Sequence, residues 1–239
     1  FTGGLGIFSR FNMTILNNTT VYHGERLIDI LHQNRKTKRK GVITVSNHTS
    51  GLDDPLVLAA ILPMREIVYF LDTMRWTLCA TNRCFRSPFW SSVFPFGRVL
   101  PVVRGAGIHQ PMMDFYVDLL NQGAWINLFP QGTRSSQHGE LLPCRPGVAR
   151  LIVDTQETPI VVPIIHENMS SILPRHAFIP KFFNTIHVLV GEPIDFQPML
   201  DTFYQNHSTP ISEKDRRALY LQIVEFLDDH LEHLQNDLR

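Results

Sequence analysis

Short apolar runs alternate along the chain with amphipathic segments whose apolar residues recur every three or four positions. The short runs are rich in β-branched and aromatic residues, which favours buried strands. The predicted strands cover residues 41–46, 67–71, 99–103, 125–129, 160–165 and 186–190. The predicted helices cover residues 24–34, 56–62, 109–121, 147–154 and 212–235, and a further short helix begins at Pro88.

Strands and helices alternate through most of the sequence, an order that is typical of α/β proteins. We therefore predict an α/β fold with a mixed, largely parallel central sheet flanked by helices. A chain of 239 residues fits one such domain. We expect residues 1–239 to form a single domain that ends in the helix at 212–235.

Residues 1–16 combine large apolar side chains with glycines, and two interpretations remain open for them. One is an amphipathic lead-in that lies on a membrane, and the other is a strand and a turn against the core. No apolar run reaches the length of about 18 residues that a helix across a bilayer needs. Because the chain starts at Phe1 rather than at Met, we expect that an upstream segment has been removed.

Composition narrows the classes of function. The formal net charge is zero, so the sequence predicts no nucleic-acid partner. Cys79, Cys84 and Cys144 show neither a CxxC pair nor the spacing of a metal site, and so sparse and odd a set argues against a disulfide scaffold. His230 and His233 share one face of a late helix without a carboxylate-rich pattern, and we expect them to be surface residues. We expect no metal ion.

The segment from Asn47 to Asp53 contains a candidate catalytic pair, His48 and Asp53. A strand is predicted to end at Ser46, so His48 lies on a loop at the edge of the sheet. The turn that leads into the next helix can bring the carboxylate to Nδ1 of His48, which leaves Nε2 free to accept a proton from a hydroxyl. The alternative is a polar turn with a helix-capping Asp53, which the pair taken alone would favour.

Two further polar groups follow predicted strands. Arg104 comes directly after one strand, where its planar guanidinium can hold a phosphate. Gln131, Gly132, Thr133 and Arg134 follow the next strand. Gly132 permits a close approach to the backbone, and Thr133 and Arg134 supply donors for phosphate or acyl oxygens. The alternatives are an exposed surface arginine and an ordinary glycine turn.

Four segments in this order resemble the motifs of the glycerophospholipid acyltransferase family. They are Asn47-His48 with Asp53, Phe96-Gly97-Arg98-Val99-Leu100-Pro101-Val102-Val103-Arg104, Phe129-Pro130-Gln131-Gly132-Thr133-Arg134, and Val161-Val162-Pro163-Ile164. The resemblance covers residues 40–195 and implies the glycerolipid acyltransferase fold.

The resemblance also implies roles for single residues. His48 is the expected general base and Asp53 its partner. Arg104, Gly132 and Thr133 are expected to bind the glycerophosphate part of a phospholipid. The further substrate-binding candidates are Asn47, Ser50, Gln131 and Arg134.

Within the family, the chain most resembles members that move an acyl chain between a phospholipid and a lysophospholipid without coenzyme A. The closer resemblance rests on Asn47-His48-Thr49-Ser50, Asp53-Asp54-Pro55, Met74-Arg75-Trp76, Cys84-Phe85 and Met113-Asp114-Phe115. It implies cardiolipin and monolysocardiolipin as substrates, no cofactor, and a monotopic position on mitochondrial membranes that face the intermembrane space. An acyl-CoA-dependent lysophospholipid acyltransferase is the alternative on the same scaffold.

One residue departs from the family pattern, which has Glu where this chain has Gln131. Gln keeps the size and one acceptor oxygen of Glu but loses its charge. We expect reduced but not absent turnover, and a weakly active membrane-binding protein is a third interpretation. A serine hydrolase is disfavoured, because the sequence contains no Gly-x-Ser-x-Gly motif.

The segment between Arg83 and Arg98 is the predicted membrane contact. Its aromatic residues include Phe85, Phe89, Trp90 and Phe94. Such side chains suit the membrane interface, and the flanking arginines can reach lipid headgroups. The alternative is a buried helix with an aromatic core of its own. The segment is too short to span a bilayer.

Overall fold

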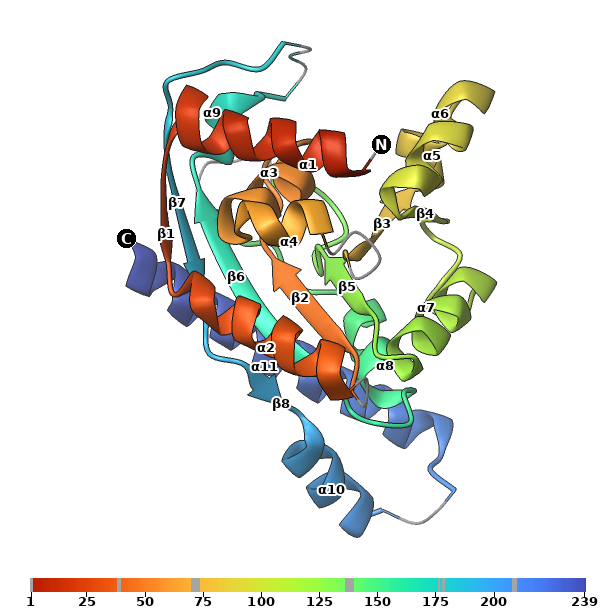
Figure 1. Ribbon diagram of the computed structural model, residues 1–239. Coiled ribbons are helices and arrows are strands. Elements are labelled where there is room, and N and C mark those ends of the chain that lie inside the picture. Colours follow the sequence, from red (N-terminus) through yellow and green to blue (C-terminus); the bar gives the residue numbers. More distant parts are fainter. Residues whose placement is uncertain are drawn as a thin grey trace.

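A computed structural model describes residues 2–37, 40–69, 74–135, 140–175, 177, 179–207 and 210–239. Within them, eight strands form one sheet in the order β1-β7-β6-β2-β5-β3-β4, with β8 paired to β6 (Figure 1). The strands are β1 (Asn18–Tyr22), β2 (Val42–Ser46), β3 (Trp76–Ala80), β4 (Val99–Val102), β5 (Trp125–Leu128), β6 (Ile160–Glu167), β7 (Thr185–Val190) and β8 (Ile194–Asp195).

The sheet is mixed and largely parallel, which confirms the predicted fold class. The neighbouring pairs from β6 through β2, β5 and β3 to β4 are all parallel, and so is the pair β1–β7. The pairs β6–β7 and β6–β8 are antiparallel. The carboxyl ends of β2, β5, β3, β4 and β6 therefore meet at one edge of the sheet, where ligands bind in open α/β sheets.

Helices cover both faces of the sheet. The helices are α1 (Thr2–Phe11), α2 (Gly24–Thr37), α3 (Asp53–Ile61), α4 (Met64–Tyr69), α5 (Thr81–Cys84), α6 (Pro88–Val93), α7 (Pro111–Asn121), α8 (Gly147–Val153), α9 (Met169–Ile172), α10 (Gln197–Gln205) and α11 (Glu213–Leu238). A π-helical turn, Asn12–Leu16, follows α1, and a 3₁₀ turn, Phe94–Gly97, follows α6.

Two apolar clusters fill the space between the helices and the sheet. Alternate residues of β6 enter different clusters: Val161 and Ile165 pack with α7, α8 and α11, and Val162 and Ile164 pack with α2 and α3. The period of two follows from the pleat of a strand. Figure 1 shows α2 and α11 on opposite faces, so both faces of β6 are buried.

The strand predicted at residues 67–71 is wrong. Residues 67–69 belong to helix α4, whose Ile67 is buried against α1, and residues 70–71 lie outside the described part of the chain. A short apolar run does not distinguish a strand from a buried helical turn by its periodicity. The sequence reasoning also missed β1, β3 and α10.

Residues 2–16 are helical, which excludes the alternative of a strand and a turn. Gly6 of α1 permits close packing, because a Cβ there would collide with Ile67 of α4. Arg10 fixes the other end of α1: its guanidinium donates to the carbonyl oxygens of Ala59, Ala60 and Leu62 at distances of 2.9, 2.7 and 2.9 Å. These carbonyls lie at the carboxyl end of α3, where helical carbonyls lack partners of their own.

A disulfide joins Cys79 and Cys84, a pair that their spacing did not predict. Cys144 is a buried free thiol, and His230 and His233 are exposed as expected.

Across the described ranges, no group of His, Cys, Asp and Glu side chains has a metal-binding arrangement. None of the helices described combines the length and apolar character needed to cross a bilayer.

Candidate active site

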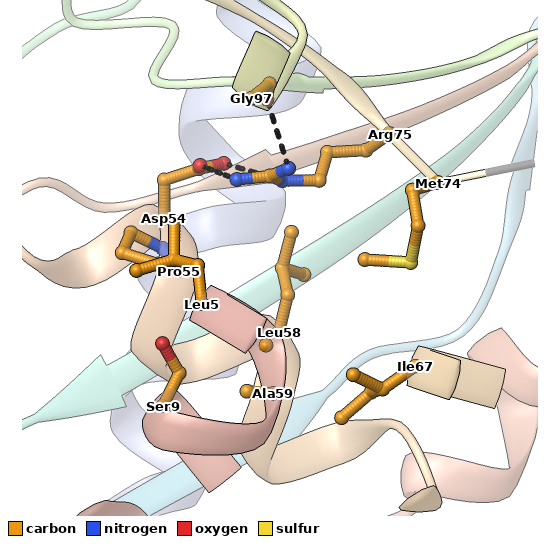
Figure 2. A pocket seen from close by; sticks show the side chains of 11 residues that line it. Leu5, Ser9, Asp54, Pro55, Leu58, Ala59, Ile67, Met74, Arg75 and Gly97 are labelled. Carbon is orange, nitrogen blue, oxygen red and sulfur yellow. Dashed lines mark hydrogen bonds and ion pairs between the residues drawn. The ribbon is translucent and has the colours of Figure 1, made fainter. Parts of the chain in front are cut away.

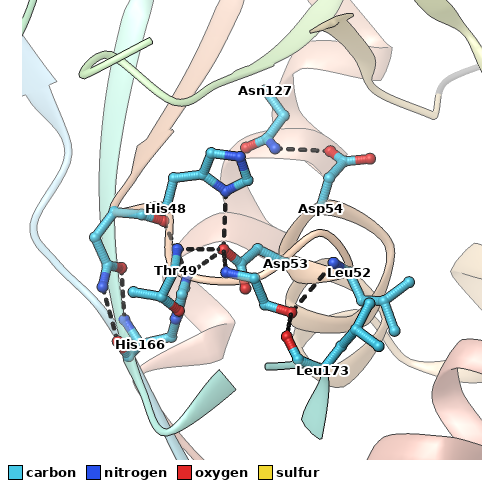
Figure 3. A network of polar contacts seen from close by, with 10 residues as sticks. His48, Thr49, Leu52, Asp53, Asp54, Asn127, His166 and Leu173 are labelled. Atoms are coloured by element: carbon cyan, nitrogen blue, oxygen red, sulfur yellow. Dashed lines mark hydrogen bonds and ion pairs between the residues drawn. The ribbon is translucent and has the colours of Figure 1, made fainter. Parts of the chain in front are cut away.

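Asp53 holds His48 in one orientation at the carboxyl end of β2 (Figure 3). One carboxylate oxygen, Oδ2, lies 2.9 Å from Nδ1 of His48. The same oxygen accepts the backbone N–H groups of Thr49 at 2.7 Å and Ser50 at 2.8 Å. Because a carboxylate oxygen is an acceptor, the proton of the neutral imidazole lies on Nδ1, and Nε2 carries the free lone pair.

Asp53 does not cap helix α3. The N-cap residue is Leu52, which makes no side-chain cap bond, and the oxygens of Asp53 accept no N–H group from the first turn of the helix. The predicted capping role is therefore wrong. Asp53 is 1% exposed, and among the described residues its carboxylate accepts hydrogen bonds only from the preceding loop, which carries His48.

The ring of His48 is also held from the side of β5. It stacks on Phe129, which follows β5, with ring centroids 4.0 Å apart and planes 18° apart. The His48 side chain keeps 20% of its surface exposed. The imidazole is thus fixed by a carboxylate and an aromatic ring but still reaches solvent, as a base that meets a substrate must.

The side chains of Asn47 and Ser50 hold the loop that carries His48. The Asn47 amide accepts the N–H of His166 at 3.0 Å and donates to its carbonyl at 2.8 Å. Ser50 is fully buried, and its hydroxyl donates to the carbonyl of Leu173 at 3.3 Å. Both side chains were expected to bind substrate, but their polar atoms are engaged within the fold. Their place in the site is to fix the loop around His48.

His166, at the end of β6, is a site residue that the sequence reasoning missed. Its Nε2 lies 2.9 Å from the carbonyl oxygen of Asn47 and 3.7 Å from Oδ2 of Asp53. Complete burial lowers the pKa of His166, and repulsion from His48 adds to this, while attraction to Asp53 opposes it. His166 is therefore neutral near pH 7 and donates its Nε2–H to Asn47. Its position at a strand end on the same edge was the available signal.

Two arginines lie across the turn that follows β5. Arg104 donates from Nη2 to the carbonyl of Gly132 at 2.9 Å, and Arg145 donates from Nε to the carbonyl of Gln131 at 3.0 Å. Gly132 has a φ of +68°, and a Cβ there would lie 3.1 Å from Cδ of Arg145. Glycine thus permits both the turn and the close approach of Arg145. The sequence reasoning did not identify Arg145 as a site residue.

Positive charge is concentrated at this edge of a chain without net charge. Burial lowers the pKa of Arg104, and repulsion from Arg83 and Arg145 lowers it further. Burial likewise lowers the pKa of Arg134, with repulsion from Arg175 as the next cause. Among the residues that the structure describes, none of these arginines is ion-paired with a carboxylate. Unpaired guanidinium groups at close range are suited to an anionic ligand.

The side chain of Gln131 is buried beside His48 without a partner. It is 3% exposed, and neither its oxygen nor its nitrogen has a hydrogen bond among the described residues. Gln131 lines a small hollow together with His48, Thr133 and Glu140. A buried polar group without a hydrogen bond costs about 1–3 kcal/mol of folding stability. A ligand whose polar atoms enter the hollow and bond to this amide would recover that free energy.

Behind the pair, Asp54 anchors the start of α3. It accepts a hydrogen bond from Asn127 of β5 at 2.7 Å and is ion-paired with Arg75, which also donates to the carbonyl of Gly97. Figure 2 shows this ion pair at one end of an apolar groove between α1 and α3. The groove is lined by Leu5, Leu58, Ala59, Ile67 and Met74.

The aromatic segment after β3 lies open to solvent. Helix α6 has no buried residue, and Phe89 and Trp90 are 65% and 48% exposed, so the alternative of a buried helix is excluded. Phe85, Phe94 and Trp90 pack in succession, with ring centroids 5.9 and 5.4 Å apart. Arg98 turns away from this surface and lies over the ring of Trp76, 5.1 Å from its centroid.

Comparison with known proteins shows that this fold belongs to enzymes that transfer acyl groups. The chain is a member of the acyltransferase family, whose family model matches residues 28–167. It is 30% identical to the N-acylphosphatidylethanolamine synthase of Arabidopsis thaliana, over 95% of this chain and 88% of that protein.

Tafazzins are also among its relatives, and they are the members of the family that the motifs at residues 47–55 resemble. The chain is 31% identical to that of Dictyostelium discoideum, over 96% of this chain and 83% of that protein. It is 36% identical to that of Drosophila melanogaster, over 82% of this chain and 51% of that protein. A solved structure, the 1-acyl-sn-glycerophosphate acyltransferase PlsC of Thermotoga maritima, shares the fold, with a TM-score of 0.57 and 19% identity over 97% of this chain and 78% of that one.

Proposed function

We propose that this acyltransferase moves acyl chains between phospholipids and lysophospholipids without coenzyme A, and that cardiolipin and monolysocardiolipin are its substrates. The observation that carries the proposal is the hydrogen bond that Nδ1 of His48 donates to Asp53, which leaves Nε2 as a free base at the edge of the sheet. The relatives named tafazzin support the choice of this branch of the family. We propose that residues 1–239 act as one acyltransferase domain.

In the proposed reaction, Nε2 of His48 removes the proton from the free hydroxyl of the lysophospholipid. The hydroxyl oxygen attacks the ester carbonyl of the donor phospholipid, and a new ester C–O bond forms. The donor C–O bond then breaks, and the imidazolium returns its proton to the departing glycerol oxygen. The donor becomes a lysophospholipid, so atoms and charge balance without a further reactant. Asp53 stabilises the imidazolium between the two proton transfers.

The arginines at the edge of the sheet hold the phosphate groups in this proposal. Arg104 and Arg145 both donate to carbonyl groups of the turn at Gly132, and the guanidinium of Arg134 lies near Gly51. Thr133 lines the hollow beside His48 and is placed to donate to an ester oxygen. The polar end of the lipid is thus bound at the arginines while its reacting oxygen lies at Nε2.

The aromatic residues of α5, α6 and the following turn provide the proposed contact with the membrane. Phe89 and Trp90 lie exposed above Phe85 and Phe94, and aromatic side chains are stable at the boundary between headgroups and acyl chains. Replacing Phe89 and Trp90 by Asp is expected to weaken sedimentation with liposomes and to leave the melting temperature unchanged. Because the relatives include tafazzins, we place the protein on mitochondrial membranes that face the intermembrane space.

A radiolabelled acyl-transfer assay tests the proposed reaction. The donor is labelled phosphatidylcholine, the acceptor is monolysocardiolipin, and each reaction is run with and without acyl-CoA. We expect transfer without acyl-CoA, its loss in His48→Ala, and no change in His230→Ala, which removes an exposed histidine on α11.

Each other outcome identifies a different function. Transfer that requires acyl-CoA identifies a lysophospholipid acyltransferase. Transfer to the amine of phosphatidylethanolamine, with none to monolysocardiolipin, identifies the activity for which the Arabidopsis relative is named. A His48→Ala variant as active as the unmodified chain rules out His48 as the base. The absence of transfer by the unmodified chain under every condition leaves a membrane-binding role, which Gln131 had kept open.

A further inference from the structure

A second apolar surface lies away from the aromatic segment of α6. It comprises Phe8 and Phe11 of α1, Ile15 of the π-helical turn, and Ile179, Phe182 and Phe183 of the loop before β7; we call it the α1–loop patch. Phe183 is 89% exposed, Ile179 79% and Ile15 64%. Single exposed apolar residues are ordinary, but large ones gathered on adjoining segments indicate an interaction surface.

Hydrogen bonds hold the loop against the end of the π-helical turn. The N–H of Phe183 donates to the carbonyl of Leu16 at 2.7 Å, and the N–H of Asn184 donates to the side-chain oxygen of Asn17 at 3.0 Å. The N–H of Lys181 donates to the carbonyl of Ile172 at 2.7 Å. The exposed residues are therefore presented by a fixed part of the fold.

The backbone at Phe183 is unfavourable for its side chain. Its φ is +64°, a left-handed conformation that bulky residues rarely adopt and that Asn or Gly adopts readily. The ring lies almost wholly in solvent, so it contributes little packing to the fold. Nothing within the described fold covers this ring, so it is open to contact with something outside the chain.

The pairing of the strands locates the patch relative to His48. Glu167, the last residue of β6, is paired with His187 of β7, and Thr185, the first residue of β7, is paired with Asn18, the first of β1. The segments before β1 and β7 therefore lie at the carboxyl end of β6. Because β2 is parallel to β6, His48, which follows β2, lies at the same edge of the sheet. Figure 1 shows α1 at this end and α6 across from it.

The strand order places the two apolar surfaces on opposite sides of the site. The α1–loop patch belongs to the β1–β7–β6 side, and α5 and α6 directly follow β3 on the β5–β3–β4 side. His48, after the central strand β2, lies between them. Arg134 lies within electrostatic range of Asp53, Arg104 and Arg175. Arg175 and Lys181 lie on the segment that carries the patch, so positive charge runs between and beside the apolar surfaces.

We infer that the α1–loop patch inserts into the surface of an anionic lipid bilayer and that the protein docks there at two places, with His48 between them. Exposed apolar side chains enter the boundary of the acyl chains while adjacent cations meet lipid phosphates, each cation contributing about 1 kcal/mol. This inference rests on the proposed function only in that the substrate lies in that bilayer. Docking on both sides would hold the site level with the lipid headgroups.

Vesicle sedimentation without any acyl donor tests the inference. The vesicles contain phosphatidylcholine with about one-fifth phosphatidylglycerol, an anionic lipid. We expect Ile179→Asn combined with Phe183→Asn to weaken binding about tenfold, because each buried apolar side chain contributes strongly to insertion. The matched control is Leu221→Asn, which removes a residue that is 55% exposed on α11, and it should bind as the unmodified chain does.

Thermal unfolding separates a docking role from a structural one. Phe183→Asn alone should melt at the same or a higher temperature, because Asn tolerates the positive φ, while its binding to vesicles falls. A lower melting temperature together with weaker binding would overturn the inference, since the ring would then stabilise the fold.

Two further outcomes would also overturn it. One is unchanged sedimentation of the Ile179→Asn, Phe183→Asn variant. The other is a concentration-dependent dimer in lipid-free solution that the variant abolishes while vesicle binding stays the same, because a second copy of the chain then covers the patch. Acyl transfer by the unmodified protein is measured separately, so a failure of the proposed reaction leaves the vesicle result intact.

Discussion

Replacing Asp53 by Asn should remove the charge beside His48 while leaving the ring in place. A single oxygen, Oδ2, accepts all three hydrogen bonds of the Asp53 carboxylate, and Oδ1 has no partner among the described residues. The Asn amide will therefore put its oxygen at the Oδ2 position and its NH₂ group at the Oδ1 position. The tautomer of His48 is kept, and the lost quantity is the attraction between carboxylate and imidazolium.

The size of that loss follows from the geometry. With the two charges about 4 Å apart and an effective dielectric constant of about 20, the attraction is about 4 kcal/mol. The imidazolium forms in the transition state, so this energy corresponds to about a 10³-fold lower kcat. Three charged hydrogen bonds become neutral, which costs about 3 kcal/mol of folding stability and lowers Tm by roughly 6–12 °C.

The assay is radiolabelled transfer from phosphatidylcholine to monolysocardiolipin, run well below the lowered Tm. The matched control is Asp54→Asn, which breaks the ion pair with Arg75 and destabilises the same helix without touching His48. We expect the control to unfold at a lower temperature and yet keep most of its kcat. The reasoning is refuted if Asp53→Asn keeps more than about a tenth of the activity, or if both variants lose kcat alike.

Three other replacements test separate parts of the site. Gln131→Glu should raise transfer about fivefold, because a carboxylate in the hollow beside His48 accepts a hydrogen bond from the substrate about 1 kcal/mol more strongly than an amide oxygen does; equal rates would contradict this. Gly132→Ala should raise KM for the lysolipid by crowding Arg145, whereas Gly107→Ala, at a φ of +78° with open space around it, should cost stability alone. His166 is kept neutral by burial, which lowers its pKa, and the unfolded chain protonates it below about pH 6.5. Stability should therefore fall as pH drops through that value, by up to about 1.4 kcal/mol per unit, and urea midpoints of His166→Gln should be flatter between pH 7.5 and 5.5.

The pattern of apolar residues was sufficient to predict the centre of the fold. The runs that became β2, β5 and β6 are rich in apolar residues because both faces are buried, and such runs are recognisable without any partner. The edge strand β1 is polar at most positions and is defined by its pairing with β7, which a local pattern does not contain. The mistaken strand at Ile67 has the same cause, since its burial depends on α1.

The part of the candidate site whose residues are close together in the sequence was predictable. His48 and Asp53 are five residues apart, and one turn brings them together. Arg145 and His166 reach the same place from distant strands and loops, and only the folded sheet shows it. Asn47 lies beside the catalytic candidate in the sequence, and the structure shows its side chain bound to the backbone of His166, which a local pattern does not reveal.

The bonds from Arg10 to α3 have a mechanical consequence. Arg10 grips the last carbonyls of a nine-residue helix, and Asp53 is the first residue of that helix. The nine residues of this helix span about 13 Å, with Arg10 bound at one end and Asp53 at the other. The outer helix α1 and the carboxylate that orients His48 are therefore joined through a single element of the fold.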